Sequence, residues 1–90
     1  MDYYEGPDYR VVFVKSALNN IKALDKEPYI KVRDVINALA YNPRPPQASK
    51  LKRSKLHMQI PAGDYTIFYD IDSVAFFVIV TKLAHREGTR

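Results

Sequence analysis

Residues 49–72 of the chain read SKLKRSKLHMQIPAGDYTIFYDID, and this stretch decides the fold. It begins as a run of positive charge and ends as a pattern in which apolar or aromatic side chains recur at every second position. That period is typical of a β-strand with one face in a core, so we expect a strand over Asp64–Ile71. A weaker strand is predicted over Leu56–Ile60. The two are joined by a turn over Pro61–Asp64, in which Gly63 can take a positive φ.

Upstream of this stretch the sequence predicts one strand and two helices. Tyr9–Val14 (YRVVFV) is rich in β-branched and aromatic residues, which favours a strand, and residues 1–8 are expected to be a loose tail. Ser16 is a candidate N-cap for a first helix that ends near residue 25. Pro28 suits the first turn of a second helix. The apolar stripe of that helix recurs at i, i+3, i+4 and i+7, as Val32, Val35, Ile36 and Leu39.

Downstream, Val74–Leu83 is the longest and most apolar segment, so we expect it to be a central strand. The predicted order is β-α-α-β-β-β. Strands that follow a helix pair indicate an α+β domain, with the helix hairpin on one face of a mostly antiparallel four-stranded sheet. Ninety residues suit a single domain, residues 1–90. The other face of the sheet would then be open for binding.

The positive charge of the chain is concentrated in its middle. The net charge is +4, and residues 35–63 carry basic side chains but no acidic one. Such a local field attracts polyanions, either nucleic-acid phosphates or an acidic protein, although a purely solubilising surface is an alternative. The basic side chains of this region are Arg44, Lys50, Lys52, Arg53 and Lys55.

Several functional classes have no signature in the sequence. There is no cysteine, hence no disulfide and no thiolate metal site, and no His/Asp/Glu cluster has metal-ligand spacing. A glycine-rich phosphate loop and a Ser-His-Asp order are also absent, so we expect neither a metal nor a cofactor. The longest apolar run, Val74–Val80, is too short to span a bilayer, and the first residues do not read as a signal peptide. We therefore expect a cytoplasmic protein that does not contact membranes.

A series of short motifs follows the first strand and helix pair. It comprises NPRP at residues 42–45, KLK at 50–52, GDY at 63–65, FYDID at 68–72 and HR at 85–86. In this order and spacing, the chain from Tyr9 to Arg86 resembles the RelE/ParE superfamily of type II toxins. The resemblance implies a compact toxin that an acidic, partly disordered antitoxin neutralises in a hetero-oligomer. RelE-like members cleave mRNA in the ribosomal A site without metal, whereas ParE-like members inhibit DNA gyrase. Other members share the fold with altered or lost activity.

Cleavage of RNA without metal requires deprotonation of the 2′-hydroxyl, stabilisation of the crowded phosphate and protonation of the 5′-oxygen. In the RelE branch these tasks fall to basic residues before the GDY-type turn, an arginine after its tyrosine, a late arginine and a C-terminal tyrosine. Here Arg86 occupies the place of the late arginine, whereas Thr66 stands where the first arginine would be. Gln59 and Pro61 occupy positions that are often basic, and no tyrosine follows Arg86.

The sequence therefore predicts a RelE-like toxin with a degenerate catalytic set that inhibits translation by ribosome-dependent mRNA cleavage. A ParE-like gyrase inhibitor and an inactive antitoxin-binding member remain alternatives. His57 and His85 join Arg86 as catalytic candidates, since histidine titrates near neutral pH. Each also has a purely structural reading, as a surface strand residue or a strand-end hydrogen-bonding residue. The candidate RNA-binding residues are Arg44, Lys50, Lys52, Arg53, Lys55 and Arg90.

Overall fold

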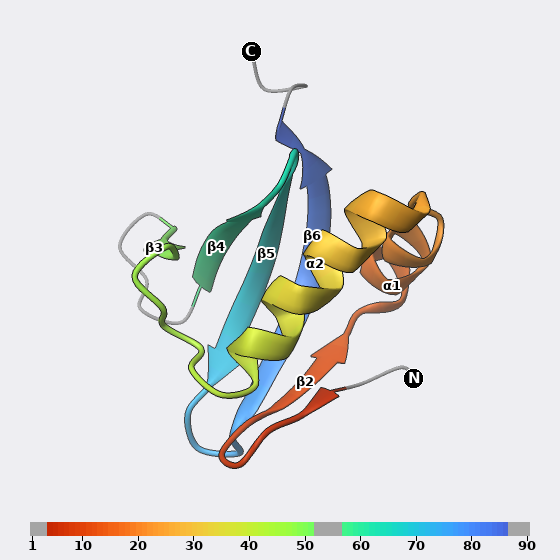
Figure 1. The fold of residues 1–90 in the computed structure, drawn as a ribbon. Helices are drawn as coiled ribbons and strands as arrows, with labels where there is room; N and C mark the ends of the chain where they lie inside the picture. The colour runs from red at the N-terminus through yellow and green to blue at the C-terminus, as the bar shows by residue number, and fades with distance from the viewer. Residues whose placement is uncertain (1–3, 52–56, 87–90) are drawn as a thin grey trace.

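The computed structural model describes residues 4–51 and 57–86, which form one layer of sheet covered by two helices (Figure 1). The two helices lie on the same side of the sheet and follow the first long strand directly. This is the α+β arrangement expected from the order of the predicted elements. The elements are β1 (Tyr4–Glu5), β2 (Arg10–Phe13), α1 (Lys15–Lys22), α2 (Lys26–Leu39), β3 (Ser49–Lys50), β4 (His57–Ala62), β5 (Tyr65–Asp72) and β6 (Phe77–His85).

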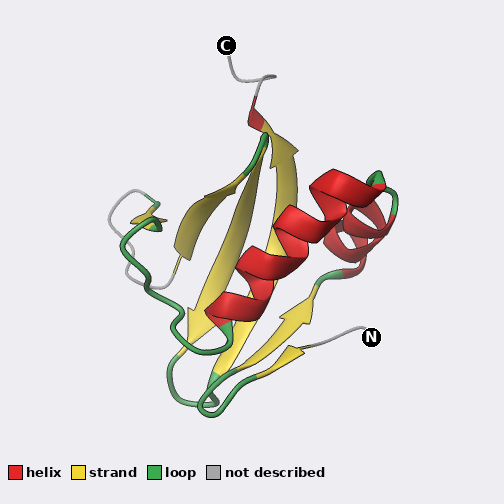
Figure 2. Cartoon of the chain, viewed as in Figure 1, coloured by secondary structure: helices red, strands yellow, loops and turns green. Residues whose placement is uncertain are grey.

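The sheet has the order β1-β2-β6-β5-β4-β3 (Figure 2). β2 pairs with β6 in parallel, and every other pair is antiparallel. The four predicted strands are therefore present as a mostly antiparallel sheet, with β6 central as expected. The structure adds two strands of two residues, β1 and β3, one at each edge. They are too short to show an alternating pattern, which is why the sequence did not reveal them.

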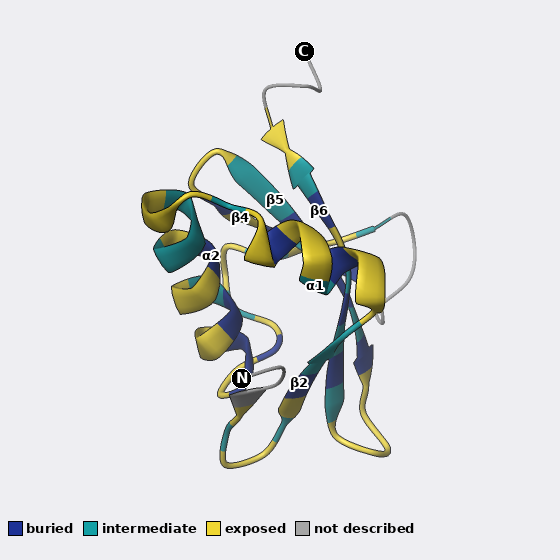
Figure 3. Ribbon diagram, turned by 90° about the vertical axis from the view of Figure 1, so that its right-hand side faces the viewer, coloured by how far each residue is buried: buried dark blue, intermediate teal, exposed yellow. Residues whose placement is uncertain are grey.

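The core lies between the sheet and the helices (Figure 3). Every second residue of β4 and β5 is buried, in agreement with the predicted alternation. The apolar stripe of α2 packs on these residues, with Val35 only partly buried. Among the described residues, the buried core positions are all apolar or aromatic. The largest fully buried side chains are Tyr69, Ile36, Leu39, Ile67, Val11, Val32, Val78 and Val80.

A β-bulge in β6 keeps its apolar side chains on the core face. The register with β5 shifts between Phe68 and Tyr69, which pair with Lys82 and Val80 respectively. Thr81 is therefore the extra residue. Val80 and Leu83 are three positions apart and would face opposite sides of a regular strand, yet both are buried because of this bulge.

The helices begin differently from the sequence expectation. α1 begins at Lys15 and takes Val14 as its N-cap, so Ser16 lies inside the first turn and does not cap it. The N–H of Val14 donates to the carbonyl of Val80 (3.0 Å), so the chain passes from the sheet into the helix without a loop. α1 ends at Lys22, a few residues before the predicted end. α2 carries Pro28 in its first turn, as predicted; proline has no backbone N–H, and a donor at this position would have no intrahelical partner.

The segment expected as a loose tail includes β1, which pairs with β2 through Tyr4–Val11 and Glu5–Arg10. The N–H of Gly6 donates to the carbonyl of Tyr9 (2.9 Å) and closes the turn between them. Gly6 also packs against the end of α2, since a Cβ at this position would lie 2.2 Å from the carbonyl oxygen of Ala40. β1 and β2 therefore form a hairpin whose turn packs closely against the end of α2, and Gly6 makes this close packing possible.

The turn between β4 and β5 is shorter than predicted. β4 continues through Pro61 to Ala62, which pairs with Tyr65, so only Gly63 and Asp64 form the loop. Gly63 has a φ of +63°, the conformation that the first loop position of a type II′ hairpin requires. Pro61 is tolerated in the strand because β3 reaches only Met58 and Gln59, leaving this part of β4 at the edge.

No helix in the described part of the chain is long and apolar enough to cross a membrane.

Candidate functional site

The sheet face opposite the helices, which we call the open face, carries the polar half of the alternating strands. No described helix covers it, and its side chains are exposed or half-buried. Cross-strand pairing places these side chains in rows, with Gln59, Phe68 and Lys82 forming the middle row. The rows on either side of it include His57, Asp70 and Ile79 in one row and Pro61, Thr66 and Ala84 in the other.

A hollow of about 220 Å³ lies at the hairpin end of the open face. Arg86 forms one side of it and hydrogen-bonds to the β4–β5 hairpin. Its backbone N–H donates to the carbonyl of Asp64 (2.7 Å), and its guanidinium donates to the carbonyl of Gly63 (3.1 Å). The guanidinium is therefore fixed beside the hollow by the hairpin. The lining residues are Ser49, Gln59, Ile60, Pro61, Thr66 and Arg86.

The lining of this hollow is neutral except for one charge. Among the described residues that line it, Arg86 is the only cation, and no carboxylate or imidazole is present. The amide of Gln59 donates to the hydroxyl of Ser49 (3.4 Å), and Thr66 adds a second hydroxyl to the lining. Such a site can bind one phosphate through the guanidinium and orient it with neutral hydrogen bonds. The described lining residues supply no group that could act as a general acid or base near neutral pH.

His57 lies at the other end of the open face. Its Nδ1 is 2.6 Å from a carboxylate oxygen of Asp70, its cross-strand partner, and more than half of its side chain is exposed. The carboxylate fixes the ring and favours a proton on Nδ1, which leaves Nε2 available to solvent. The backbone of Arg86 is hydrogen-bonded to that of Asp64, which is six positions from Asp70 in the chain. His57 and Arg86 are therefore separated by roughly 20 Å along the strands.

His85 faces the helix side of the sheet, away from Arg86. Its ring makes an edge-to-face contact with Tyr65, with centroids 4.9 Å apart. Both rings line a second hollow of about 370 Å³ beside the first turn of α2, together with Glu27 and Lys31. The structure therefore separates the three predicted catalytic residues and brings no two of them into one site.

No group of three potential metal ligands occurs in the described residues.

Two features of the open face were not singled out from the sequence. The ammonium group of Lys82 lies 5.6 Å from the centroid of the Phe68 ring, a cation–π geometry. Asp70 was also not recognised as the partner of His57. The alternation of β5 places Thr66, Phe68 and Asp70 on one face. The residues opposite them on β4 and β6 depend on the bulge and on the strand register, which the sequence of one strand does not reveal.

The predicted basic surface is only partly described. Lys50 is exposed in β3, and Arg44 is exposed in the loop after α2. Lys52, Arg53, Lys55 and Arg90 lie outside the described residues. Of the predicted RNA-binding residues, the structure therefore describes only Arg44 and Lys50.

The loop that carries Arg44 is fixed to the core by Tyr69. The Tyr69 hydroxyl donates to the carbonyl of Pro43 at 2.7 Å. Burial raises the pKa of Tyr69 to about 12, and the nearby charge of Arg44 partly opposes this rise.

Comparison with solved structures identifies the fold. A chain of the RelE–RelB complex from the archaeon Pyrococcus horikoshii OT3 superposes with a TM-score of 0.79 at 24% identity, covering 88% of this chain and 96% of that chain. The chain has the RelE fold. The isolated RelE toxin of Escherichia coli gives a TM-score of 0.73 at 17% identity, with 83% of this chain and 81% of that chain covered.

A second complex shows the same likeness. A chain of the RelBE2 toxin–antitoxin complex from Mycobacterium tuberculosis gives a TM-score of 0.75 at 22% identity, covering 88% of this chain and 99% of that chain. By sequence, no family model and no curated protein matches the chain. The expected RelE-like fold is thus confirmed by three-dimensional likeness, at identities where the sequence alone gives no match.

Proposed function

We propose that the chain is the toxin of a type II toxin–antitoxin module and that it inhibits translation by cleaving mRNA on the ribosome. The RelE fold, shared over most of the chain with an isolated RelE toxin, is the observation that carries this proposal. Arg86 supports it, since this late arginine is held by the β4–β5 hairpin at the edge of a hollow on the open face.

In this proposal Arg86 binds the scissile phosphate. Its charge stabilises the additional negative charge that develops as the 2′-oxygen attacks phosphorus. Neutral hydrogen-bond groups at Ser49, Gln59 and Thr66 orient the phosphate. Because no described residue that lines the hollow has a carboxylate or an imidazole, both proton transfers are assigned to solvent or to ribosomal groups. The reaction is then slow and depends on the ribosome, which agrees with the degenerate catalytic set inferred from the sequence.

The roles of His57 and His85 are limited by their positions. His57 can contact RNA bound along the open face, with Asp70 orienting its ring, but its backbone is roughly 20 Å from Arg86 along the strands. His85 faces the helix side and contacts Tyr65. We therefore assign the phosphate-binding role to Arg86 alone and place both histidines outside the reacting centre.

The proposed partner is a cognate antitoxin with acidic, partly disordered segments. Three of the solved relatives are RelE–RelB or RelBE2 toxin–antitoxin complexes, which supports a partner of this kind. The cationic surface that includes Arg44 and Lys50 would attract an acidic segment and accelerate its association. The antitoxin would then mask the surface that we propose to contact RNA.

A non-nuclease toxin, directed at DNA gyrase or lacking activity altogether, is the second candidate. The observation that favours it is that, among the described lining residues, Arg86 is the only cation, whereas Thr66, Gln59 and Pro61 stand where the resemblance leads one to expect cations. It predicts that growth arrest, where it occurs, does not require Arg86.

Inducible expression in a bacterial host with mapping of mRNA 5′ ends distinguishes these functions. The proposal predicts growth arrest with new 5′ ends at codons inside reading frames, and their loss in Arg86→Ala. Arg33→Ala is the matched control, because Arg33 is exposed on α2 and lies outside the hollow. DNA-damage signalling with intact message would indicate the gyrase-directed alternative. Harmless expression together with tight antitoxin binding would indicate the inactive one.

A further inference from the structure

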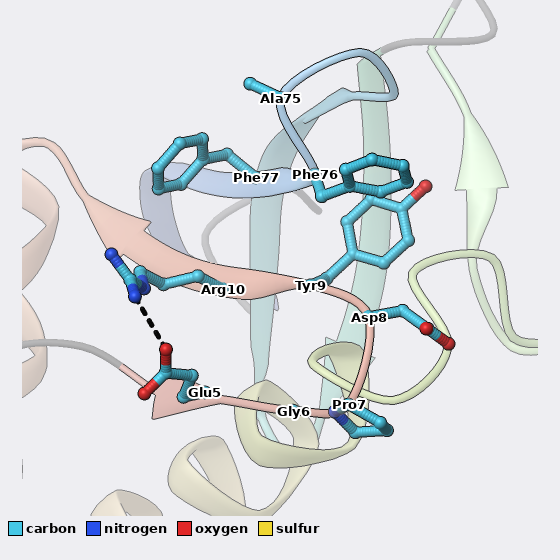
Figure 4. Close-up of a pocket in the computed structure, with 9 residues that line it drawn as sticks. All are labelled: Glu5, Gly6, Pro7, Asp8, Tyr9, Arg10, Ala75, Phe76 and Phe77. Carbon is cyan, nitrogen blue, oxygen red and sulfur yellow. Dashed lines mark hydrogen bonds and ion pairs between the residues drawn. The ribbon is translucent and has the colours of Figure 1, made fainter.

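The turn over residues 73–76, which joins β5 to β6, presents an apolar surface at the end of the sheet farthest from Arg86. Val74 is 90% exposed and Phe76 is 52% exposed, which makes them prominent among the exposed large apolar side chains of the described residues. The ring of Tyr9 packs edge-on against Phe76, with centroids 5.6 Å apart (Figure 4). We call Tyr9, Val74 and Phe76 the apolar tip.

The turn is built to hold this exposed arrangement. The carboxylate of Asp72 accepts hydrogen bonds from the N–H of Val74 (3.0 Å) and of Ala75 (2.9 Å). The carbonyl of Phe76 accepts one from the N–H of Arg10 (3.0 Å). Phe76 has a φ of +62°, a backbone conformation that a bulky aromatic residue rarely takes. Strain of this kind persists where the surrounding contacts enforce it, and it is concentrated at functional positions.

The apolar tip borders a hollow of about 330 Å³ with an acidic rim (Figure 4). Glu5 forms an ion pair with Arg10 at 2.6 Å, so the charges of these two residues offset each other. Asp8 also lines the hollow and forms no ion pair with a described residue. With Asp72 at the adjoining turn, this end of the molecule carries excess negative charge, although the chain as a whole carries +4.

The size and charge of this surface indicate what it can bind. The exposed areas of Val74 and Phe76 amount to a few hundred Å², since a whole aromatic side chain offers only about 150–250 Å². A stable interface needs roughly 800 Å² on each partner. A second copy of the chain would also bring two acidic rims together. A short segment with one anchoring side chain fits both constraints better than a folded partner does.

We propose that the apolar tip binds a short lysine- or arginine-rich segment of another protein that carries one apolar or aromatic anchor. The anchor packs on Phe76 and Val74 beside the ring of Tyr9, and the flanking cations face Asp8 and Asp72. The site goes beyond the proposed function. β6 separates it by about 30 Å from the Arg86 hollow, and its rim would repel the acidic antitoxin.

Two synthetic peptides of 12 residues test the proposal with the full chain. Both carry a central Leu-Trp pair. In one peptide, three lysines flank the pair on each side. In the other peptide, three glutamates flank it on each side. We expect the lysine peptide to bind at least about tenfold more tightly by fluorescence anisotropy, with salt weakening it. It should shift the amide NMR signals of Asp8, Val74 and Phe76. Peptide binding does not depend on mRNA cleavage, so failure of either proposal leaves the other standing.

Variants locate the binding surface. Val74→Lys and Asp8→Lys should each weaken the lysine peptide at least about fivefold, and both residues are exposed enough for the fold to be retained. Tyr41→Ser and Asp34→Lys, which change an exposed aromatic and an exposed acid away from this hollow, should leave binding unchanged. Equal affinity for the two peptides, no binding, or shifts confined to other residues would overturn the proposal. So would a dimer in sedimentation that Val74→Lys dissolves, because that would make a second copy the occupant.

Discussion

Replacing Tyr69 by phenylalanine tests how the loop after α2 is held to the core. Tyr69 is 0% exposed, and its hydroxyl donates to the carbonyl of Pro43 at 2.7 Å. Phenylalanine keeps the packing of the ring but leaves that carbonyl without its partner. Loss of a buried hydrogen bond of this kind costs about 1–3 kcal/mol. We expect urea unfolding at pH 7 to show Tyr69→Phe destabilised by this amount.

The pH dependence of the same comparison is more specific. Burial raises the pKa of Tyr69 to about 12 in the folded state, against about 10 in the unfolded chain. Below pH 10 the phenol is neutral in the folded and unfolded states, so its contribution to the free energy of unfolding is fully present. Between pH 10 and 12 the unfolded chain binds fewer protons than the folded chain. Stability therefore falls, by about 3 kcal/mol over two pH units.

Tyr69→Phe has no phenol at this position, so its unfolding free energy does not fall through this titration. We therefore expect the difference in unfolding free energy between the wild type and Tyr69→Phe to shrink as the pH rises from 10 to 12. Tyr41→Phe is the matched control, since Tyr41 is 63% exposed. Parallel losses of stability in the wild type and Tyr69→Phe would refute the raised pKa. Equal stability at pH 7 would refute the hydrogen bond.

Three further substitutions follow from the geometry. Gly6→Ala should lower the free energy of unfolding by about 1–3 kcal/mol in thermal melts, because its Cβ would overlap the Ala40 carbonyl, and unchanged stability would contradict that packing. Gly63→Ala should cost about 1–2 kcal/mol through its φ of +63°, and a stabilised variant would show that the hairpin takes another conformation. Thr66→Arg adds a second cation to the hollow beside Arg86 and should raise mRNA cleavage at least about tenfold, whereas an unchanged rate would show that charge does not limit the reaction.

The fold could be predicted from the sequence because its strongest signals are local. The alternation of β5 and the helical stripe of α2 both reappear as buried faces. The misses have local causes as well. Ser16 has good N-cap chemistry, but the bond from Val14 to the sheet places the N-cap of α1 two residues earlier, at Val14. The two-residue strands β1 and β3 depend on partners distant in the sequence, so no pattern within them could reveal them.

The candidate site could be predicted only as a set of residue types. Arg86, His57 and His85 were identified as residues with suitable chemistry, yet strand register determines which of them meet. His85 and Arg86 are neighbours in the chain, yet His85 ends β6 beside Tyr65 on the helix side, whereas Arg86 lies just past the strand and lines the hollow on the open face. The distance between His57 and Arg86 required the pairing of β4 with β5. The apolar tip depends on a turn over residues 73–76, whereas the sequence predicted that the last strand already begins at Val74; it begins at Phe77.

Cleavage of mRNA on purified ribosomes is the most direct test of whether the chain is a ribosome-dependent nuclease. Ribosomes with a defined codon in the A site are incubated with the full chain, and the mRNA ends are read by primer extension. We expect slow cuts in the A-site codon that require the ribosome, with the rate reduced at least about tenfold in Arg86→Ala and unchanged in Arg33→Ala. Intact mRNA on the ribosome, or cleavage by Arg86→Ala at the wild-type rate, would contradict it.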